Sequence, residues 1–243
     1  MQSVFYQTFL SEQDKNILLI GGGGKSALIN KLAADAKYYN KVTVIASLFP
    51  LAAPYESSTL ISKDPVLLRK QLANELAKYK TVFIGKTIDK NYILPFTKIE
   101  LEKIMSNNPA DHFFIEADNT RGRSLSGFEK VDPLLPFKIH SVINVLGADV
   151  INQHRNENWT LSRNKLLLQD SFMTPQNLAS MYLAHPKLIK IRKRCSSQIF
   201  FLNKVENLLV ENLAIQLTKK LRLGGIEKVV MGSIYNSTLL QLK

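Results

Sequence analysis

A chain of 243 residues, 45% of them hydrophobic, is long enough to bury a substantial core, and we expect one α/β domain over residues 1–243. No apolar run approaches the roughly 18 residues of a membrane span, the first residues lack a signal-peptide pattern, and Cys195 has no partner cysteine. These features predict a soluble, cytoplasmic protein. The net charge of +12 favours nucleic acid, acidic membranes or phosphorylated ligands, without choosing among them.

The first half of the chain predicts a parallel sheet with helices between its strands. Short apolar runs alternate with segments whose apolar residues recur at helical spacing. Continuous apolar strands of this kind suit a parallel sheet. The predicted strands lie at 16–20, 41–46, 81–85 and 112–117, and the predicted helices follow the glycines at 21–24 and lie at 66–76 and 97–106.

The second half predicts a long loop, a possible insertion and a return to the sheet. Residues 118–136 contain glycines and prolines and should form a loop of a kind that is often functional. Residues 147–195 are a possible inserted cap, in which Thr174 and Pro175 begin a helix. An apolar segment is predicted at 139–146, strands at 198–202 and 228–231, a helix at 208–221, and an amphipathic segment with a solvated basic face at 187–194.

These elements together predict the fold class. We expect an α/β protein with a mostly parallel sheet flanked by helices, similar to the P-loop NTPases, and with a helical or loop insertion in its second half.

A glycine-rich turn, GGGGKS, joins the first predicted strand to the first predicted helix. Glycines allow successive backbone N–H groups to turn toward a phosphate, and the helix presents its positive end to the same group. Lys25 would contact the terminal phosphates during catalysis, and the hydroxyl of Ser26 would bind Mg²⁺. The predicted nucleotide-binding residues are Gly21, Gly22, Gly23, Gly24, Lys25, Ser26 and Ala27.

The spacing of this turn departs from the standard Walker A pattern, because Leu19 stands where that pattern has its first glycine. The turn resembles the shorter GGxGK[ST] loop of the ParA, MinD and nitrogenase iron protein class. The additional signature lysine of that class would fall at Ile20. We therefore predict no lysine that acts on a second copy of the chain.

Two carboxylates stand at the end of the strand predicted at 112–117. Ligands of parallel α/β sheets bind at the carboxyl ends of the strands, so we expect Glu116 and Asp118 to reach the glycine turn. Asp118 would hold Mg²⁺ directly or through water, and Glu116 would orient a water or act as a base. Arg121 and Arg123 either contact phosphate oxygens or are ordinary surface charges.

A second candidate motif, NKVE, follows the strand predicted at 198–202. Asn203, Lys204 and Glu206 resemble the NKxD base-recognition motif of G proteins, with Glu in place of Asp. In that motif the carboxylate accepts hydrogen bonds from N1 and N2 of guanine, and the longer Glu would require a shifted base. We therefore include these three residues in the nucleotide site and leave ATP and GTP open.

The polar segment HRNE contains His154, Arg155 and Glu157. The histidine could act as an acid or base near neutral pH, and the arginine could contact an anion. A solvated loop explains the same residues equally well. No cysteine or second histidine stands at zinc-ligand spacing.

These motifs, in this order, resemble the YqeC family, whose members are described as selenium-dependent hydroxylase accessory proteins. The resemblance spans most of the chain and depends on GGGGKS, the segment from EADNTRGRSL to VDPLLP, HRNE and LNKVE. It implies a P-loop-like nucleotide-binding protein that takes part in maturing molybdenum hydroxylases with labile selenium. The chain departs from the family at Asn119, Thr120 and Ser126, where Gly, Ser and Lys are usual.

The leading hypothesis is Mg²⁺-dependent binding and slow hydrolysis of ATP or GTP in the maturation of such a hydroxylase. The partners would then be the nucleotide and a molybdenum hydroxylase or its maturation proteins, without a membrane or nucleic acid. One alternative is a small-molecule kinase whose acceptor lies in 147–171. The other is a non-catalytic, nucleotide-dependent switch or scaffold whose basic face docks an acidic partner or nucleic acid.

Overall fold

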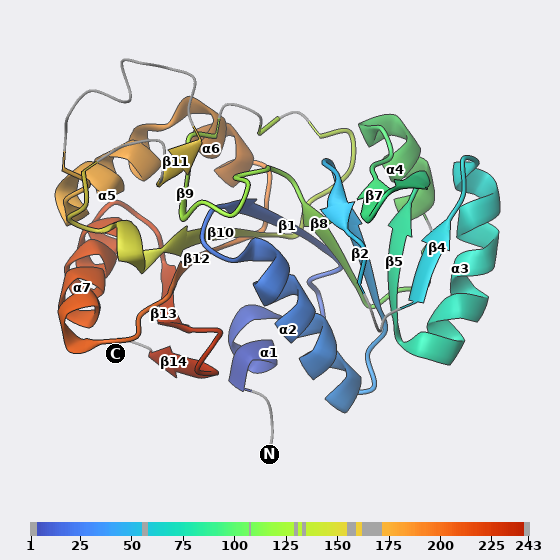
Figure 1. Ribbon diagram of the computed structural model, residues 1–243, viewed down its shortest axis with the longest axis horizontal. Coiled ribbons are helices and arrows are strands. Elements are labelled where there is room, and N and C mark those ends of the chain that lie inside the picture. The colour runs from blue at the N-terminus through green and yellow to red at the C-terminus, as the bar shows by residue number, and fades with distance from the viewer. Residues whose placement is uncertain are drawn as a thin grey trace. The chain divides into compact units, whose positions relative to one another are not determined.

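The predicted α/β fold class is confirmed by a computed structural model of the chain. Its principal sheet has nine strands in the order β14-β13-β12-β10-β1-β8-β2-β5-β4, mostly parallel, and helices flank it (Figure 1). The structure describes residues 4–54, 58–106, 108–128, 131–132, 135–154, 159–161 and 172–240.

The chain forms two compact units, which we call unit 1 and unit 2. Strand β1 (Asn16–Gly21) and helix α2 (Lys25–Tyr38) contribute residues to both units. The single domain expected from the length of the chain stays a prediction. Unit 1 comprises Met1–Leu18, Ile29–Ala117 and Leu134–His140, and unit 2 comprises Leu19–Leu28, Asp118–Pro133 and Ser141–Lys243.

Unit 1 contains parallel strands that are buried because their sequences are almost continuously apolar. Every residue of β2 and of β5 is buried, and β2 pairs in parallel with β8 and β5. Strand β4 adds to β5, and β3, β7 and β6 form a small separate sheet. The bounds in unit 1 are α1 Val4–Phe9, β2 Thr43–Ser47, β3 Leu51–Ala52, β4 Ser58–Ile61, α3 Pro65–Tyr79, β5 Thr81–Gly85, β6 Thr87–Asp89, β7 Tyr92–Leu94, α4 Lys98–Met105 and β8 His112–Glu116.

Helix α3 shows how the sequence fixes an element of unit 1. The side chain of Asp64 accepts hydrogen bonds from the backbone N–H groups of Val66 and Leu67, and Pro65 occupies the first helical position. Leu68, Leu72 and Leu76, spaced four residues apart, are the buried residues of the helix. The helix therefore begins at its capping residue and packs through one apolar stripe.

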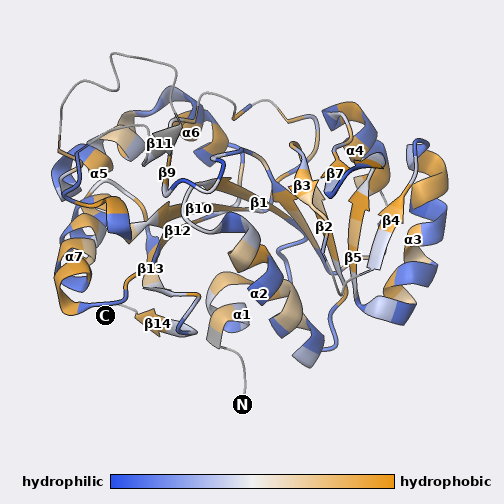
Figure 2. Ribbon diagram, viewed as in Figure 1, coloured by the Kyte–Doolittle hydropathy of each residue, from blue (hydrophilic) through white to orange (hydrophobic). Residues whose placement is uncertain are grey.

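Unit 2 contains the parallel strands β10, β12 and β13, and the antiparallel strand β14 pairs with β13. Helix α5 packs against α7. Figure 2 shows that β10 and β12 are mostly hydrophobic, whereas α7 contains both hydrophobic and hydrophilic residues. The bounds in unit 2 are β9 Leu125–Ser126, β10 Ser141–Gly147, η1 Ala148–Val150, β11 Thr160–Leu161, α5 Pro175–Ala184, α6 Pro186–Arg192, β12 Ser197–Asn203, α7 Leu208–Leu223, β13 Lys228–Ser233 and β14 Thr238–Leu240.

The described part of the section expected to be an insertion includes the helices α5 and α6, which lie in the chain between the neighbouring parallel strands β10 and β12. Thr174 caps α5 by accepting a hydrogen bond from the N–H of Asn177, as its position before Pro175 predicts. The basic amphipathic segment is helix α6, whose buried residues are Leu188 and Ile191. In the described part of the chain, no helix combines the length and the apolar character needed to cross a membrane.

Candidate functional site

The glycine-rich turn joins the end of β1 to the start of α2 in unit 2. Gly21, Gly23 and Gly24 have φ angles of +101°, +82° and +123°, a backbone region that side chains rarely adopt. A Cβ at Gly21 would overlap the carbonyl of Val145, and one at Gly23 would overlap the backbone of Gly147. The glycines are therefore required by backbone that passes close to β10.

Two N–H groups of the turn donate hydrogen bonds to backbone carbonyls of unit 2. Gly22 donates to the carbonyl of Val145 at 2.8 Å, and Gly23 donates to the carbonyl of Arg123 at 2.9 Å. The expectation that all successive glycine N–H groups turn toward a phosphate is therefore wrong for these two. The N-terminal end of an α-helix favours an anion, and α2 presents this end at the glycine turn.

Lys25 and Asp118 form a buried ion pair at this turn. Nζ of Lys25 is 2.9 Å from Oδ1 of Asp118 and donates a hydrogen bond of 2.6 Å to the carbonyl of Gly21. Lys25 is 4% exposed and Asp118 is 2% exposed. The other oxygen of Asp118 accepts hydrogen bonds from the N–H of Gly21 at 3.0 Å and from the hydroxyl of Ser126 at 2.8 Å.

This arrangement gives Asp118 a role that the sequence did not predict. Its carboxylate neutralises Lys25 and fixes the end of β1, whereas the sequence assigned it to Mg²⁺. The metal role stays a prediction. Ser126 contributes a neutral hydroxyl to this carboxylate.

Ser26 and Ala27 are exposed in the first turn of α2. The hydroxyl of Ser26 is a hard oxygen donor of the type that Mg²⁺ accepts, and it lies beside the N-terminal end of a 14-residue helix. The residues therefore fit a metal that is bound together with a phosphate. Ligand contacts of both residues stay predictions.

Asn203, at the end of β12, connects the glycine turn to the end of β13. Its side-chain nitrogen donates to the carbonyl of Gly23 at 2.7 Å, and its side-chain oxygen accepts from the N–H of Ile234 at 3.0 Å. Asn203 is buried. The structure therefore brings the first residue of NKVE to the glycine turn.

Lys204 leaves the strand in a left-handed conformation, with φ of +64°. Its ammonium donates to the hydroxyl of Ser124 at 2.7 Å and to Oδ2 of Asp149 at 2.8 Å. The hydroxyl of Ser124 donates to the same carboxylate oxygen at 3.0 Å. Lys204 therefore holds the loop after Asp118 against the end of β10, and its contact with a nucleotide stays a prediction.

Glu206 is exposed and lies beside the end of β13. Oε1 of Glu206 accepts a hydrogen bond of 2.9 Å from the hydroxyl of the buried Ser233. The N–H of Val205 donates to the carbonyl of Gly232 at 3.0 Å, so the backbone before Glu206 is also attached to β13. These contacts fix the position of the carboxylate.

The remaining predicted residues are Glu116, Arg121, Arg123 and those of the HRNE segment. Glu116 belongs to unit 1, where its carbonyl accepts from the N–H of Leu48. Arg121 is exposed, and the carbonyl of Arg123 supports the glycine turn. The exposed His154 packs against Phe172, with ring centroids 3.9 Å apart, and Arg155 and Glu157 lie outside the described residues.

The cluster also contains residues that the sequence did not single out as site residues. Asp149 and Ser233 are polar residues outside the motifs named above, and Ser124 and Ser126 lie in the segment from EADNTRGRSL to VDPLLP. Their roles depend on partners between 8 and 80 residues away in the chain. The sequence signal that could have identified Asp149 and Ser233 is their position at strand ends: Asp149 follows β10, and Ser233 ends β13. Polar residues just after apolar strands are therefore the pattern that finds this site.

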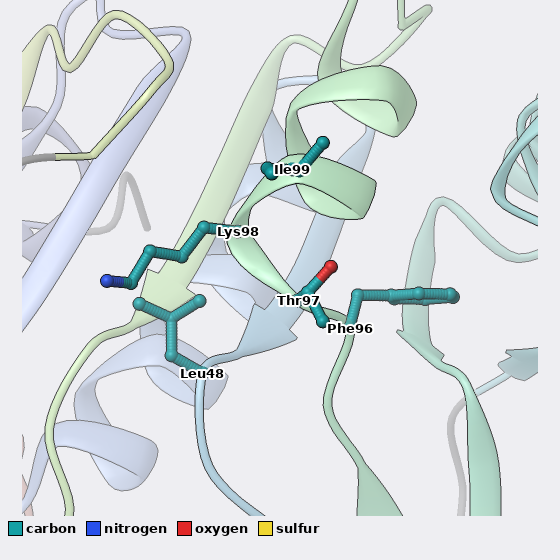
Figure 3. Close-up of a pocket in the computed structure, with 5 residues that line it drawn as sticks. All are labelled: Leu48, Phe96, Thr97, Lys98 and Ile99. Carbon is teal, nitrogen blue, oxygen red and sulfur yellow. The ribbon is translucent and has the colours of Figure 1, made fainter.

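Unit 1 has a hollow of about 420 Å³ at the start of α4. It is lined by Leu48, Phe96, Thr97, Lys98 and Ile99, which Figure 3 shows as sticks. None of these five is among the predicted site residues.

The fold and this cluster define a class: α/β proteins in which polar groups gather at the carboxyl ends of the strands of a mostly parallel sheet. The strand ends concerned are those of β1, β10, β12 and β13, at Gly21, Gly147, Asn203 and Ser233. The family model described as YqeC protein matches residues 17–163. This is more than half of the chain, which therefore belongs to the YqeC family. A comparison with curated proteins found no match. The matched region includes Lys25 and Asp118 and ends before NKVE.

Proposed function

We propose that unit 2 binds the triphosphate of ATP or GTP at the glycine turn. The observation that supports this proposal is the buried Lys25–Asp118 pair at the N-terminal end of α2. The positive end of a helix disfavours a lysine, so this position needs an anion. Asp118 supplies one within the protein, and a terminal phosphate would be a second anion within reach of the same ammonium.

The proposed metal is Mg²⁺, held by the hydroxyl of Ser26 together with phosphate oxygens. Asp118, already bound to Lys25, would contribute through water. Mg²⁺ supplies neutralisation of the charge that develops on the transferred phosphoryl group. The task of the protein is then to position the triphosphate, which Lys25 and the start of α2 perform.

We further propose that the nucleotide is hydrolysed slowly and that the cycle serves the maturation of a selenium-dependent molybdenum hydroxylase. Hydrolysis needs few groups beyond a positioned triphosphate, a metal and a carboxylate that orients water. Membership of the YqeC family supports the link to maturation, because the sequence resemblance implies it.

Thermal melting of the purified chain with ATP, GTP and ADP, with and without Mg²⁺, tests the binding proposal. A ligand at 100 times its dissociation constant adds about 2.7 kcal/mol to the free energy of unfolding. We expect a shift in melting temperature with the triphosphates that increases with Mg²⁺. No shift with any nucleotide, supported by calorimetry that detects no heat of binding, would refute the proposal.

Ser26→Ala is a substitution that should not disturb the fold, because Ser26 is exposed and alanine favours a helix. We expect this variant to fold and to lose the Mg²⁺-dependent part of the shift. Ser180→Ala is the matched control, since Ser180 is an exposed serine on α5. Equal Mg²⁺ dependence in both variants would contradict the role of Ser26.

Phosphate release and complementation test turnover and maturation. Purified chain should release phosphate from a triphosphate slowly, and Ser26→Ala should release less. Cells that lack the chain should show reduced activity of a selenium-dependent molybdenum hydroxylase, restored by the wild-type chain and not by Ser26→Ala. Hydroxylase activity that is independent of the chain would remove the link to maturation while leaving nucleotide binding intact.

A further inference from the structure

We infer that this site selects guanine, with the Glu206 carboxylate as the group that recognises the base. The inference rests on the proposed nucleotide binding and goes further by naming the base. It depends on two contacts: Asn203 bound to the glycine turn, and Glu206 bound to Ser233.

The first step is the connection between the turn and the strand ends. The side chain of Asn203 is hydrogen-bonded to both Gly23 and Ile234. It therefore connects the glycine turn and the end of β12 to the segment that follows β13. Because Asn203 is bonded to the glycine turn, we place the base of a nucleotide whose phosphates lie on this turn beside the residues that follow Asn203. Those residues are Lys204, Val205 and Glu206.

The second step is which of these three side chains is available to a base. Val205 is buried, and Lys204 is bound to Ser124 and Asp149. Glu206 is exposed. The exposed carboxylate is therefore the group that a base at this position meets.

The third step is the chemistry of the carboxylate. An ionised carboxylate only accepts hydrogen bonds and has about four acceptor positions, of which the hydroxyl of Ser233 takes one. Guanine presents two adjacent donors, N1–H and the 2-amino group, on one edge. Adenine presents the lone pair of N1 there, which a carboxylate repels. The carboxylate therefore favours guanine over adenine.

The fourth step concerns the extra methylene of Glu relative to Asp. A free Glu side chain loses more rotamer entropy than Asp when it is ordered by a ligand. The bond from Ser233 holds Oε1 at 2.9 Å before a ligand arrives, which lowers that cost. Ser233 is thus a positioning residue for Glu206.

Calorimetric titration of the full chain with Mg²⁺ and GTP, ITP or ATP tests this inference. ITP keeps N1–H and lacks the 2-amino group, so it retains one of the two bonds. We expect affinity in the order GTP, ITP, ATP, with GTP bound about tenfold or more tighter than ATP. Equal affinities for GTP and ATP would overturn the guanine inference and leave nucleotide binding standing. No binding of any of the three would overturn both.

Glu206→Gln supplies the matching variant. The amide can donate to the 2-carbonyl of xanthine, so the preference for GTP over ATP should fall about tenfold and binding of XTP should increase. Glu227→Gln removes the same charge at another exposed position of unit 2 and should keep the wild-type preference. An unchanged preference in a folded Glu206→Gln protein would overturn the inference.

Discussion

The side-chain nitrogen of Asn203 donates a hydrogen bond of 2.7 Å to the carbonyl oxygen of Gly23, which precedes it by 180 residues. The same side chain accepts from the N–H of Ile234, so one buried amide serves two backbone segments. An unsatisfied buried polar group is costly, and removing this amide would leave both segments without their partner. The conformation of the glycine turn therefore depends on β12 and β13.

Asn203→Ala should lower the free energy of unfolding by about 1–3 kcal/mol, because it leaves buried backbone groups unpaired. It should also weaken the binding of every nucleotide, since the turn loses its support. Urea denaturation and calorimetry measure the two effects. Asn236→Ala, at an exposed asparagine of the next loop, should change neither. A wild-type denaturation midpoint in Asn203→Ala would show that the turn does not depend on this bond.

The Lys25–Asp118 pair predicts strong coupling in stability. Lys25→Met or Asp118→Leu alone should cost about 3–5 kcal/mol, because each leaves an uncompensated buried charge. The double variant should cost less than the sum, since it removes both charges. The half-exposed Lys204–Asp149 pair is the comparison, and Lys204→Met should cost about 1 kcal/mol or less. Additive costs for Lys25 and Asp118 would contradict the buried pair.

The sequence predicts the long elements of the fold because their local signals agree with their packing. The strand predicted at 81–85 is β5 with the same bounds, and the helix predicted at 66–76 is the centre of α3. The elements that were not predicted are all short: α1, β3, β4, β6, β7, β9, η1, β11 and β14. Their existence depends on tertiary contacts: Tyr6 of α1, for instance, stacks on Tyr39 with ring centroids 4.4 Å apart.

In the candidate site, too, the residues that could be predicted are those with a local sequence signal. The positions of Lys25 and Asn203 could be predicted because each belongs to a motif at a strand end. The pairing of Lys25 with Asp118 could not, because it joins residues that are far apart in sequence and buried in the fold. Ser233 was missed because the strand predicted at 228–231 ended two residues before β13 does.

The glycine turn predicts different costs for two similar substitutions. Gly21→Ala places a methyl group against the carbonyl of Val145, whereas Gly225, with φ of +89°, has open space around it. Gly225→Ala should therefore cost only the backbone strain, about 1–2 kcal/mol. Gly21→Ala should cost clearly more and disturb nucleotide binding. Thermal melting compares the two variants. Equal losses in melting temperature would show that the backbone of β10 shifts to accommodate the methyl group.

The buried His112 predicts a loss of stability below neutral pH. Its Nδ1 donates to the carbonyl of Asp14 at 2.7 Å, and its Nε2 accepts from the hydroxyl of Tyr6 at 2.8 Å. Burial lowers the pKa of His112 from 6.5 and raises the pKa of Tyr6 to about 12. Both shifts favour the neutral pair that these hydrogen bonds require.

The unfolded chain binds a proton at His112 at a higher pH than the folded chain does, and this difference determines how stability changes with pH. Below pH 6.5 the unfolded chain protonates His112 while the folded chain keeps it neutral, so stability decreases as the pH falls toward the lowered pKa. His112→Gln should be less stable than wild type at pH 7, by about 1–3 kcal/mol, and should lose less stability between pH 7 and pH 5. Burial also lowers the pKa of His140 and His185, so the variant removes only part of the pH dependence.

Tyr6→Phe is the matched control for His112→Gln. It removes the hydroxyl that donates to Nε2 and keeps the buried imidazole. It should therefore lower stability at pH 7 and, unlike His112→Gln, retain a decrease in stability toward pH 5. Urea denaturation at pH 5, 6 and 7 measures the three proteins. If His112→Gln loses as much stability between pH 7 and pH 5 as wild type does, then the pH dependence comes from groups other than His112.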